Sequence, residues 1–302
     1  MKPRIVFMGT PEFAVASLDA LIKAGHNIVG VITAPDKPAG RGMKMNESAV
    51  KKYAVEHSLY ILQPEKLKNP EFLSQLKELK ADLQVVVAFR MLPEVVWNMP
   101  PMGTINVHAS LLPKYRGAAP VNWAIINGEK ESGVTTFKLA HEIDTGNILL
   151  QQKVKIDDED NAGVLHDKLK QAGADLLIKT VNGLADKSIA EQPQTGNENI
   201  HAPKLNSETA RINWQLPAEK IHNLIRGLSP YPAAFTLLKG KIFKIYKSEF
   251  KIVVPAVEPG NYETDNKSYL SFAAAEGYIY AKEVQAEGKR KMSVEEFLKG
   301  FR

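Results

Sequence analysis

The chain has 302 residues, none of them cysteine; 44% are hydrophobic and 24% are charged. Without cysteine, disulfides, thiolate catalysis and cysteine-ligated metal sites are excluded, and the lack of cysteine fits a reducing compartment without proving one. No apolar run approaches the roughly 20 residues that span a bilayer, and a strand predicted from Arg4 onward leaves no room for a signal peptide. We therefore expect a cytoplasmic protein, long enough for two domains with their own cores.

The net charge of +5 comes entirely from the C-terminal third of the sequence. Residues 1–203 contain 23 Lys and Arg against 23 Asp and Glu, whereas residues 204–302 contain 16 against 11. A basic segment beside a neutral one favours a polyanionic partner for the basic segment. An ordinary solvated surface is the alternative, because charge alone is weak evidence.

The first 190 residues alternate predicted strands and helices. Strands are expected at residues 5–8, 28–34, 59–62, 83–89, 104–108, 134–139 and 148–156. Helices are expected at residues 11–24, 46–57 (capped by Asn46), 69 onward (capped by Asn69), 120–127 and 161–186. This alternation predicts one α/β domain with a parallel, doubly wound sheet. Neither a G-x-G-x-x-G nor a G-x-x-x-x-G-K-[ST] motif is present, so we expect no dinucleotide or ATP site.

The pattern changes after residue 190. Residues 191–206 contain few large apolar side chains and are predicted to be a linker. A helix at residues 218–226 is followed by short strands expected at residues 235–238, 242–246, 250–254, 269–272 and 278–281. This spacing predicts a small β-barrel of the oligonucleotide-binding type. Lysines alternate with aromatic residues between positions 239 and 251, a pattern typical of a surface that follows phosphates.

Residues 104–120 contain the side chains that best predict chemistry. Residues 104–108 alternate as in a strand, so Asn106 and His108 share one face near its end. A Ser-Leu-Leu-Pro sequence then breaks the strand, and Pro120 suits the first turn of a helix. A strand end, a loop and a helix start form the usual binding edge of an open α/β sheet.

An amide beside an imidazole suits reaction at a carbonyl carbon. A histidine of ordinary pKa, about 6.5, can move a proton near neutral pH, and an amide donor can stabilise an oxyanion. Asp144, in an Asp-Thr-Gly turn after a strand, is the best candidate for a carboxylate that orients His108. The sequence has neither a cysteine nor a G-x-S-x-G motif. These two absences disfavour covalent catalysis and favour direct attack of an amine on a carbonyl.

Each of these features also has a simpler interpretation. A strand histidine is more often a core residue with satisfied hydrogen bonds. An aspartic protease needs two carboxylates that share a proton, and this chain has one Asp-Thr-Gly sequence. Ser110 lacks the glycines of a nucleophile elbow, so a role in the loop backbone is favoured. His108 and His141 lack a third ligand at suitable spacing, so no metal is expected.

Residues 36–44 read Asp-Lys-Pro-Ala-Gly-Arg-Gly-Met-Lys. Two glycines, a proline and three cations predict a mobile basic loop at the carboxyl end of the second strand, too irregular to form part of the sheet. Such a loop is well placed to close over a phosphate-bearing substrate, and a solvated surface loop is the alternative.

These motifs together resemble the formyltransferases that use 10-formyltetrahydrofolate. The resemblance covers essentially the whole chain and is most specific at Asn106-x-His108, residues 110–120 and residues 144–146. Residues 9–11, 36–42 and 202–205 are similar to the members that act on methionyl-tRNA. The resemblance implies a Rossmann-like catalytic domain at residues 1–190, a linker at 191–206 and a tRNA-binding β-barrel domain at 207–302. Phe89-Arg90 departs from the family, which usually has Tyr-Gly there.

The resemblance also implies roles for individual residues. It implies that Asn106, His108 and Asp144 are catalytic. It implies that the folate co-substrate, 10-formyltetrahydrofolate, is contacted by Ser110, Leu111, Leu112 and Pro113. It implies that the acceptor arm of the tRNA is contacted by Arg41, Lys37 and Lys44. The implied reaction moves the formyl group to the free amino group of the methionine on initiator methionyl-tRNA, for translation initiation, by a protein that we expect to be a monomer.

Three other hypotheses remain open. The acceptor is an amino-sugar nucleotide in the first, which would leave the basic loop and the basic barrel without a use. In the second, water replaces the amine and the protein hydrolyses formylfolate. The third is a non-catalytic RNA-binding protein, for which the three polar residues have no evident use.

Overall fold

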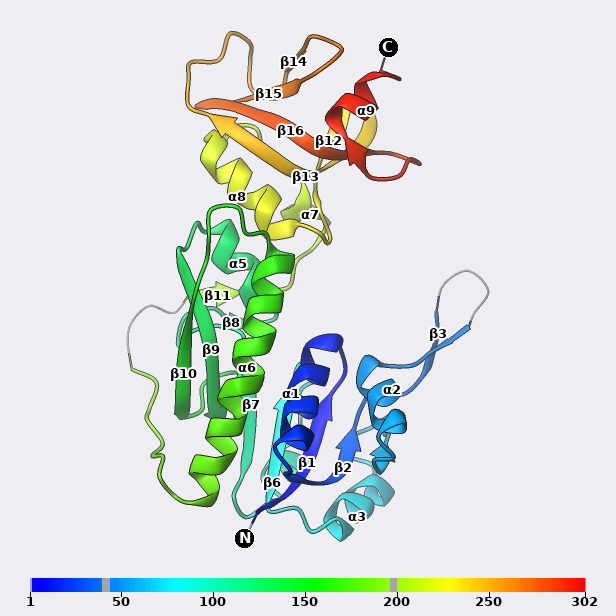
Figure 1. The fold of residues 1–302 in the computed structure, drawn as a ribbon, viewed down its shortest axis with the longest axis vertical. Coiled ribbons are helices and arrows are strands. Elements are labelled where there is room, and N and C mark those ends of the chain that lie inside the picture. Colours follow the sequence, from blue (N-terminus) through cyan, green and yellow to red (C-terminus); the bar gives the residue numbers. More distant parts are fainter. Residues whose placement is uncertain (1, 40–43, 196–199, 302) are drawn as a thin grey trace. The chain divides into compact units, whose positions relative to one another are not determined.

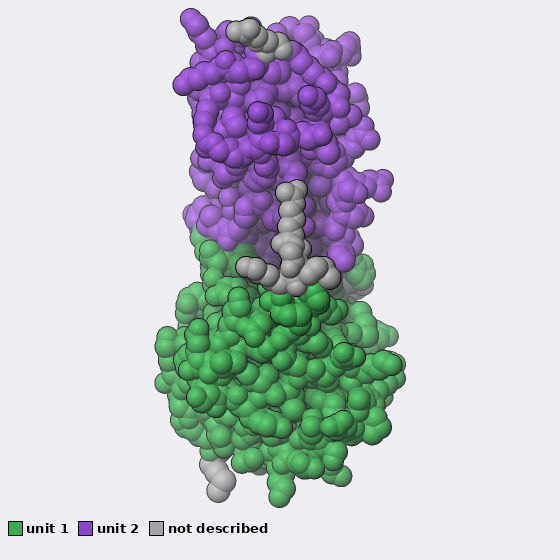
Figure 2. All heavy atoms as spheres, turned by 90° about the vertical axis from the view of Figure 1, so that its right-hand side faces the viewer, with its two compact units in different colours: residues 1–117, 133–154, 166–201 green, residues 118–132, 155–165, 202–302 purple. Residues whose placement is uncertain are grey.

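The computed structural model describes residues 2–39, 44–195 and 200–301. The chain forms two compact units (Figure 2). Unit 1 comprises Met1–Gly117, Gly133–Val154 and His166–His201, and unit 2 comprises Ala118–Ser132, Lys155–Leu165 and Ala202–Arg302. Unit 2 thus includes two segments from within residues 1–190, and the boundaries of the predicted domains and linker stay a prediction. None of the helices among the described residues is both long and apolar enough to cross a membrane.

Unit 1 is built on a seven-stranded sheet in the order β10-β9-β7-β6-β1-β2-β5 (Figure 1). Its strands are β1 (Arg4–Gly9), β2 (Asn27–Ile32), β5 (Ile61–Leu62), β6 (Leu83–Val87), β7 (Thr104–His108), β9 (Glu131–Lys138) and β10 (Ile148–Lys155). The five strands β7, β6, β1, β2 and β5 are parallel to one another. This confirms the expected Rossmann-like sheet.

The expectation of a wholly parallel sheet is wrong at β9, which pairs antiparallel with β7. Ile105 at the start of β7 lies opposite Lys138 at the end of β9, and His108 lies opposite Thr135. The alternation of apolar residues records which side chains are buried but not the direction of the strand. The sequence pattern therefore does not predict the antiparallel direction of β9.

Helices cover both faces of this sheet, as a parallel sheet requires. They are α1 (Glu12–Lys23), α2 (Ala49–Glu56), α3 (Pro70–Glu78), α4 (Glu94–Trp97) and α6 (Ala162–Ala185). On one face, Val6 and Met8 share an apolar cluster with Phe72 of α3. On the other face, α6 approaches the sheet at Gly173, where an added Cβ would lie 3.1 Å from Val107.

The predicted caps of α3 and α2 have different outcomes. Asn69 caps α3 as expected and accepts from the N–H of Glu71. The expected cap of α2 is wrong: Ser48 accepts from the N–H of Lys51, while Asn46 lies in a strand. Asn46 and Ser48 are both good capping residues, so local preference alone does not choose between them.

The ends of the predicted basic loop form a hairpin apart from the main sheet. Strand β3 (Lys37–Ala39) pairs antiparallel with β4 (Lys44–Asn46) in a separate two-stranded sheet, so the segment stays out of the main sheet as expected, although its ends are regular strands. At the base of the hairpin, Asp36 forms an ion pair with Lys51 and accepts a hydrogen bond from Gln63 over 2.8 Å. These hydrogen bonds lower the pKa of Asp36 and fix the base of the hairpin to the body of unit 1.

Unit 2 contains an antiparallel sheet in the order β12-β13-β16-β15-β14, with β17 paired to β16. The strands are β12 (Ala234–Leu238), β13 (Lys241–Lys251), β14 (Tyr262–Thr264), β15 (Leu270–Ala274), β16 (Gly277–Ala286) and β17 (Met292–Ser293). The helices are α5 (Pro120–Ile126), α7 (Ser207–Ala210), α8 (Ala218–Leu228) and α9 (Val294–Leu298). The expected β-rich C-terminal domain is confirmed. Outside the two larger sheets, β8 (Arg116–Gly117) of unit 1 and β11 (His201–Ala202) are further short strands.

The strand expected at residues 242–246 and the start of the one expected at 250–254 belong to one continuous strand, β13, which ends at Lys251. Its pairing with β16 shifts register between Ile245 and Lys247 and again between Lys247 and Ser248. These irregularities interrupt the alternation of apolar residues without ending the strand, which explains the wrong division. Strand β14 was not predicted.

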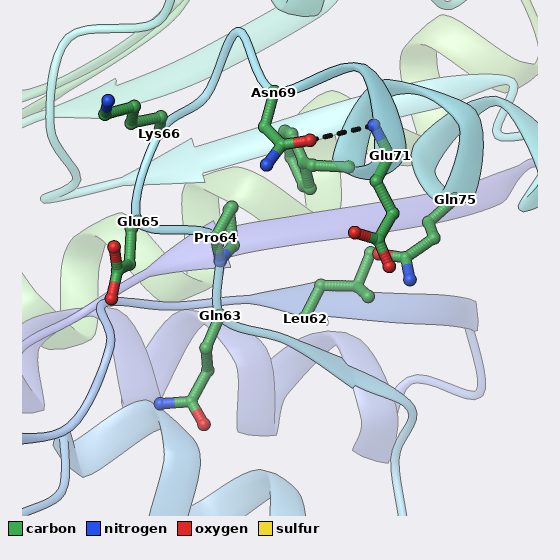
Figure 3. Close-up of a pocket in the computed structure, with 9 residues that line it drawn as sticks. Leu62, Gln63, Pro64, Glu65, Lys66, Asn69, Glu71 and Gln75 are labelled. Atoms are coloured by element: carbon green, nitrogen blue, oxygen red, sulfur yellow. Dashed lines mark hydrogen bonds between the residues drawn. The ribbon is translucent and has the colours of Figure 1, made fainter.

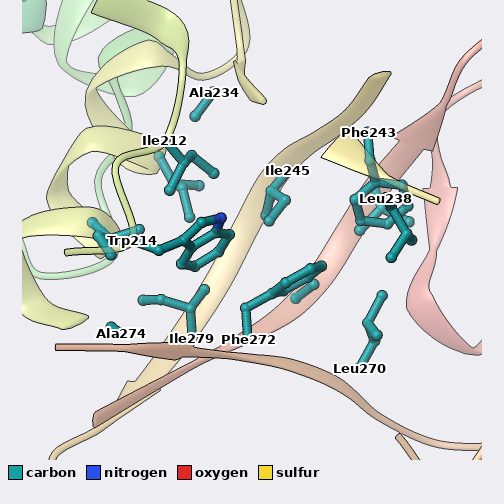
Figure 4. Close-up of a cluster of buried hydrophobic side chains, with 14 of the residues drawn as sticks. Ile212, Trp214, Ala234, Leu238, Phe243, Ile245, Leu270, Phe272, Ala274 and Ile279 are labelled. Atoms are coloured by element: carbon teal, nitrogen blue, oxygen red, sulfur yellow. The ribbon is translucent and has the colours of Figure 1, made fainter. Parts of the chain in front are cut away.

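An apolar cluster joins α8 to this sheet (Figure 4). The ring of Trp214 stacks on that of Phe272, with 4.9 Å between centroids and 15° between planes. The indole N–H donates to the hydroxyl of Thr236 over 3.0 Å, so the one polar atom of this buried ring has a partner. The cluster gives unit 2 a hydrophobic core of its own.

His222 of α8 makes the stability of unit 2 sensitive to acid. Its ring lies 5.1 Å from that of Phe250, and its Nδ1 is 3.0 Å from the Ser248 hydroxyl. Burial, aided by Arg226, lowers the pKa of His222 from 6.5 to about 4, against the opposing pull of Glu159 and Glu249. The folded chain thus keeps this imidazole neutral at pH values where the unfolded chain protonates it.

We expect the free energy of unfolding to fall as the pH drops from 6.5 toward 4. In that window the unfolded chain binds a proton that the folded chain does not, and lowering the pKa of His222 from 6.5 to about 4 corresponds to roughly 3 kcal/mol. Urea titrations of the wild type and of His222→Gln measure the effect, because carboxylates contribute equally to both. The variant should lose less stability over this window; equal losses would contradict the assignment.

Candidate active site

Strand β7 places an amide and an imidazole at the binding edge of the sheet. Asn106 is half-buried and lies in register between Val86 of β6 and Phe137 of β9. His108, two residues further on, is 8% exposed and ends the strand. Because side chains alternate along a strand, Asn106 and His108 face the same side, as the sequence predicts.

The hydrogen bond of His108 decides which ring nitrogen is available for chemistry. Its Nε2 lies 2.9 Å from the main-chain oxygen of Tyr115. A carbonyl oxygen can only accept, so Nε2 carries the proton and donates it. Nδ1 is therefore the nitrogen that can take up and return a proton, and the loop after β7 fixes this tautomer.

Asp144 reaches His108 from the loop between β9 and β10. Its Oδ2 lies 3.8 Å from Nδ1 of His108, and the exposed fractions of the two side chains are 11% and 9%. The same Oδ2 accepts the N–H of Gly117 over 3.0 Å. The distance between Nδ1 and Oδ2 is too long for a hydrogen bond but short enough for an ion pair once the imidazole is protonated. The structure thus brings His108 and Asp144 together, at the end of the strand that carries Asn106.

The loop of Asp144 has an unusual backbone. Lys138 at the end of β9 lies opposite Ile105, at the far end of β7 from His108, so the loop must return along β7 to reach the imidazole. Asp144 has φ of 55°, in the left-handed region that aspartate tolerates better than most residues. An added Cβ on Gly146 would lie 1.7 Å from the main-chain oxygen of Lys138. This turn therefore requires glycine at position 146.

The Ser-Leu-Leu-Pro loop is fastened by residues of β9 and β10. Ser110 is buried and donates its hydroxyl to the oxygen of Lys114 over 2.7 Å, so it supports the loop as expected. The Thr135 hydroxyl donates to the oxygen of Ser110 and accepts the N–H of Leu112 over 3.1 Å. Gln151 donates to the oxygen of Leu112 over 2.9 Å. Thr135 and Gln151 belong to no sequence motif, so the sequence alone does not predict their contacts with this loop.

A cavity of about 190 Å³ lies away from these residues (Figure 3). It is lined by residues 62–66, 69, 71, 72 and 75, at the end of β5 and the start of α3. Next to it, Arg90 donates to the main-chain oxygens of Pro64 and of Glu65, the latter over 2.8 Å. Burial lowers the pKa of Arg90. The residue that departs from the family pattern thus joins the loops after β6 and β5.

Two of the three predicted tRNA contacts, Lys37 and Lys44, lie on strands β3 and β4. Lys37 is exposed on β3, and Lys44 pairs with Ala39 through the backbone. Arg41 lies outside the described residues. Among the described residues there is no group of three or more histidine, aspartate or glutamate side chains arranged to hold a metal ion.

Comparison with known proteins fits this architecture. The formyl transferase family model matches residues 3–181, and the model of the formyl transferase C-terminal domain matches residues 204–302. A methionyl-tRNA formyltransferase of Bacteroides fragilis is 51% identical over 307 residues, covering 99% of this chain and 95% of its own. The chain belongs to the methionyl-tRNA formyltransferase family. A family member from Caldanaerobacter subterraneus is 46% identical over 299 residues, covering 98% of this chain and 96% of its own.

Two solved structures share the fold. An N-formyltransferase from Helicobacter canadensis, in complex with folinic acid and dTDP-3-aminofucose, matches with a TM-score of 0.70 at 22% identity. The match covers 95% of this formyltransferase and 100% of that chain. HypX from Aquifex aeolicus, in complex with tetrahydrofolic acid, matches with a TM-score of 0.66 at 17% identity, over 99% of this chain and 48% of its own.

Proposed function

We propose that this formyltransferase moves the formyl group of 10-formyltetrahydrofolate to the amino group of methionine on initiator methionyl-tRNA. Identity of 51% across nearly the whole chain to relatives named for this substrate supports the acceptor. Solved structures of the same fold that hold folate derivatives support a folate donor. The proposed acceptor implies a role in translation initiation in the cytoplasm.

The observation that carries the proposed mechanism is the pairing of His108 and Asp144. Nδ1 of His108 lies 3.8 Å from the Asp144 carboxylate, while Nε2 is held by the Tyr115 carbonyl. A proton taken up by this imidazole therefore gains a nearby negative charge. With the amide of Asn106 on the same strand face, the three side chains supply an oxyanion donor and a proton carrier.

The reaction proceeds through a tetrahedral intermediate. The amine lone pair attacks the formyl carbon, and the electrons of the C=O bond move to its oxygen, which Asn106 stabilises. Nδ1 of His108 takes the proton that the attacking nitrogen loses, and the protonated imidazole adds to the stabilisation of the oxyanion. His108 then gives this proton to the folate nitrogen as the bond between that nitrogen and the formyl carbon breaks. Asp144 holds the imidazole for this transfer. The products are formylmethionyl-tRNA and tetrahydrofolate.

The proposed substrates are tested with charged initiator tRNA and labelled 10-formyltetrahydrofolate. We expect the label to appear on the aminoacyl ester and to be released as formylmethionine when the ester is cleaved. Label on an amino-sugar nucleotide instead would identify a sugar formyltransferase, and formate release without an acceptor would identify a hydrolase. Either outcome would overturn the proposed function.

We propose that Lys37 and Lys44, with Arg41 between them, contact the tRNA backbone near its acceptor end, and that the basic residues of unit 2 contact the rest. Binding should then weaken steeply with salt, because each phosphate contact releases counterions. Lys37→Ala should reduce the slope of log affinity against log salt by about 1. Filter-binding titrations at several salt concentrations measure this, with Lys179→Ala on the exposed surface of α6 as the control. An unchanged slope for Lys37→Ala would remove Lys37 from the interface.

A further inference from the structure

A residue far along the chain fastens the turn that carries Asp144. Gln194 donates from its Nε2 to the main-chain oxygens of Asp144 and Gly146, each over 2.8 Å. A glutamine amide has two N–H donors, so a single side chain satisfies both carbonyls. Because Asp144 adopts positive φ, its conformation depends on such outside support. Gln194 supplies that support.

The oxygen of the Gln194 amide is held in turn. Arg116 donates to Oε1 from Nε over 3.1 Å and from Nη2 over 2.5 Å. Two guanidinium donors on one side and two carbonyl acceptors on the other permit only one orientation of the amide. The next residue, Gly117, donates its N–H to Oδ2 of Asp144. Hydrogen bonds thus connect Arg116 to Gln194, Gln194 to the turn of Asp144, and the Asp144 carboxylate to Gly117, the residue after Arg116.

We propose that Gln194 is a positioning residue for formyl transfer, which keeps the Asp144 carboxylate beside Nδ1 of His108. The proposal rests on the role of Asp144 in the proposed function. Gln194 acts through Asp144, and Arg116 fixes the orientation of Gln194. Without these hydrogen bonds the turn is free to move, and the Asp144 carboxylate leaves its position 3.8 Å from Nδ1 of His108. Such a displacement slows the chemical step and leaves substrate affinity unchanged.

Two substitutions of Gln194 separate the parts of this contact. Gln194→Glu keeps the size of the side chain and an oxygen for Arg116, but it removes both N–H donors. Gln194→Leu removes donors and acceptor together. The matched control is Gln171→Glu, because Gln171 donates to the Asp175 carboxylate on the exposed face of α6 over 3.0 Å. Thermal unfolding of each variant checks that it folds, and Gln194→Asn replaces any that does not.

Steady-state and single-turnover formylation give the expected result. Both variants should lower kcat by about 10–100-fold, the effect of a misplaced catalytic group, with KM for each substrate within about twofold of wild type. The control should stay within about twofold in every parameter. A role confined to stability would lower the unfolding midpoint without this separation of kcat from KM.

Combination with Asp144→Asn decides whether Gln194 acts through the carboxylate. Asparagine tolerates positive φ, so this variant removes the charge and spares the backbone. Gln194→Leu added to Asp144→Asn should slow the reaction by less than about twofold more. If Gln194→Leu lowers kcat as much in Asp144→Asn as it does in the wild type, Gln194 does not act through the carboxylate. If Asp144→Asn is slow but the Gln194 variants keep the wild-type kcat, Gln194 has no role in the reaction. Each of these outcomes would overturn the role of Gln194 and leave that of Asp144 intact. Wild-type kcat in Asp144→Asn would overturn the role of Asp144 and this inference with it.

Discussion

His108→Ala is expected to lower the single-turnover rate of formyl transfer by about 10²–10⁴-fold, the usual range for loss of an acid–base group. The imidazole is the one group of the proposed three with a ring nitrogen free to take up a proton and return it. The hydrogen bond from Nε2 to the Tyr115 carbonyl fixes the ring so that Nδ1 lies beside Asp144. Alanine removes this nitrogen. Rapid-quench measurement of label on the aminoacyl ester gives the rate.

The control for this substitution is His57→Ala. His57 is exposed at the end of α2 and stacks on Tyr53, with 4.0 Å between the ring centroids. It should leave the transfer rate within about twofold of wild type. A His108→Ala rate within tenfold of wild type, about 1.4 kcal/mol of barrier, would remove His108 from the chemistry.

Gly146→Ala is expected to disable the site without touching any of its polar side chains. The new Cβ would lie 1.7 Å from the oxygen of Lys138 and 2.8 Å from its carbonyl carbon, so the backbone must shift. Asp144 is two residues away, and Gln194 binds the oxygens of both residues. We expect the transfer rate to fall by about 10²-fold, and the free energy of unfolding to fall by about 1–3 kcal/mol.

A second glycine offers a matched control for this change. Gly300→Ala places its Cβ 3.9 Å from the nearest atom, the oxygen of Phe297, so nothing need move. Urea unfolding and single-turnover formylation of the two variants should differ as predicted. If Gly146→Ala retains the wild-type rate, the carboxylate does not depend on the shape of this turn.

Most of the fold follows from apolar patterns that the sequence displays openly. Strand β6, buried at every position, reads as an apolar run and occupies the centre of the sheet. The α3 cap at Asn69 and the helix start at Pro120 follow local rules that the structure keeps. The direction of β9 and the continuity of β13 could not be predicted, because both depend on pairing between distant segments.

The candidate site divides in the same way. Asn106 and His108 are two residues apart on one strand, so the sequence alone predicts that they share a face. Their approach to Asp144 follows from a loop that returns along β7 from the end of an antiparallel strand, and no local pattern records such a path. Gln194 lies in a segment whose composition predicts a linker, and only the folded chain shows its hydrogen bonds to the Asp144 turn.

The central claim is that His108 and Asp144 act as one unit on a single formyl carbon. The most direct test is the single-turnover rate of label transfer to methionyl-tRNA for His108→Ala, Asp144→Asn and the double variant. Groups that act together lose their effect together, so the double variant should be within about threefold of the slower single variant. Two losses that multiply in the double variant would show that the imidazole and the carboxylate act independently, and would contradict the mechanism.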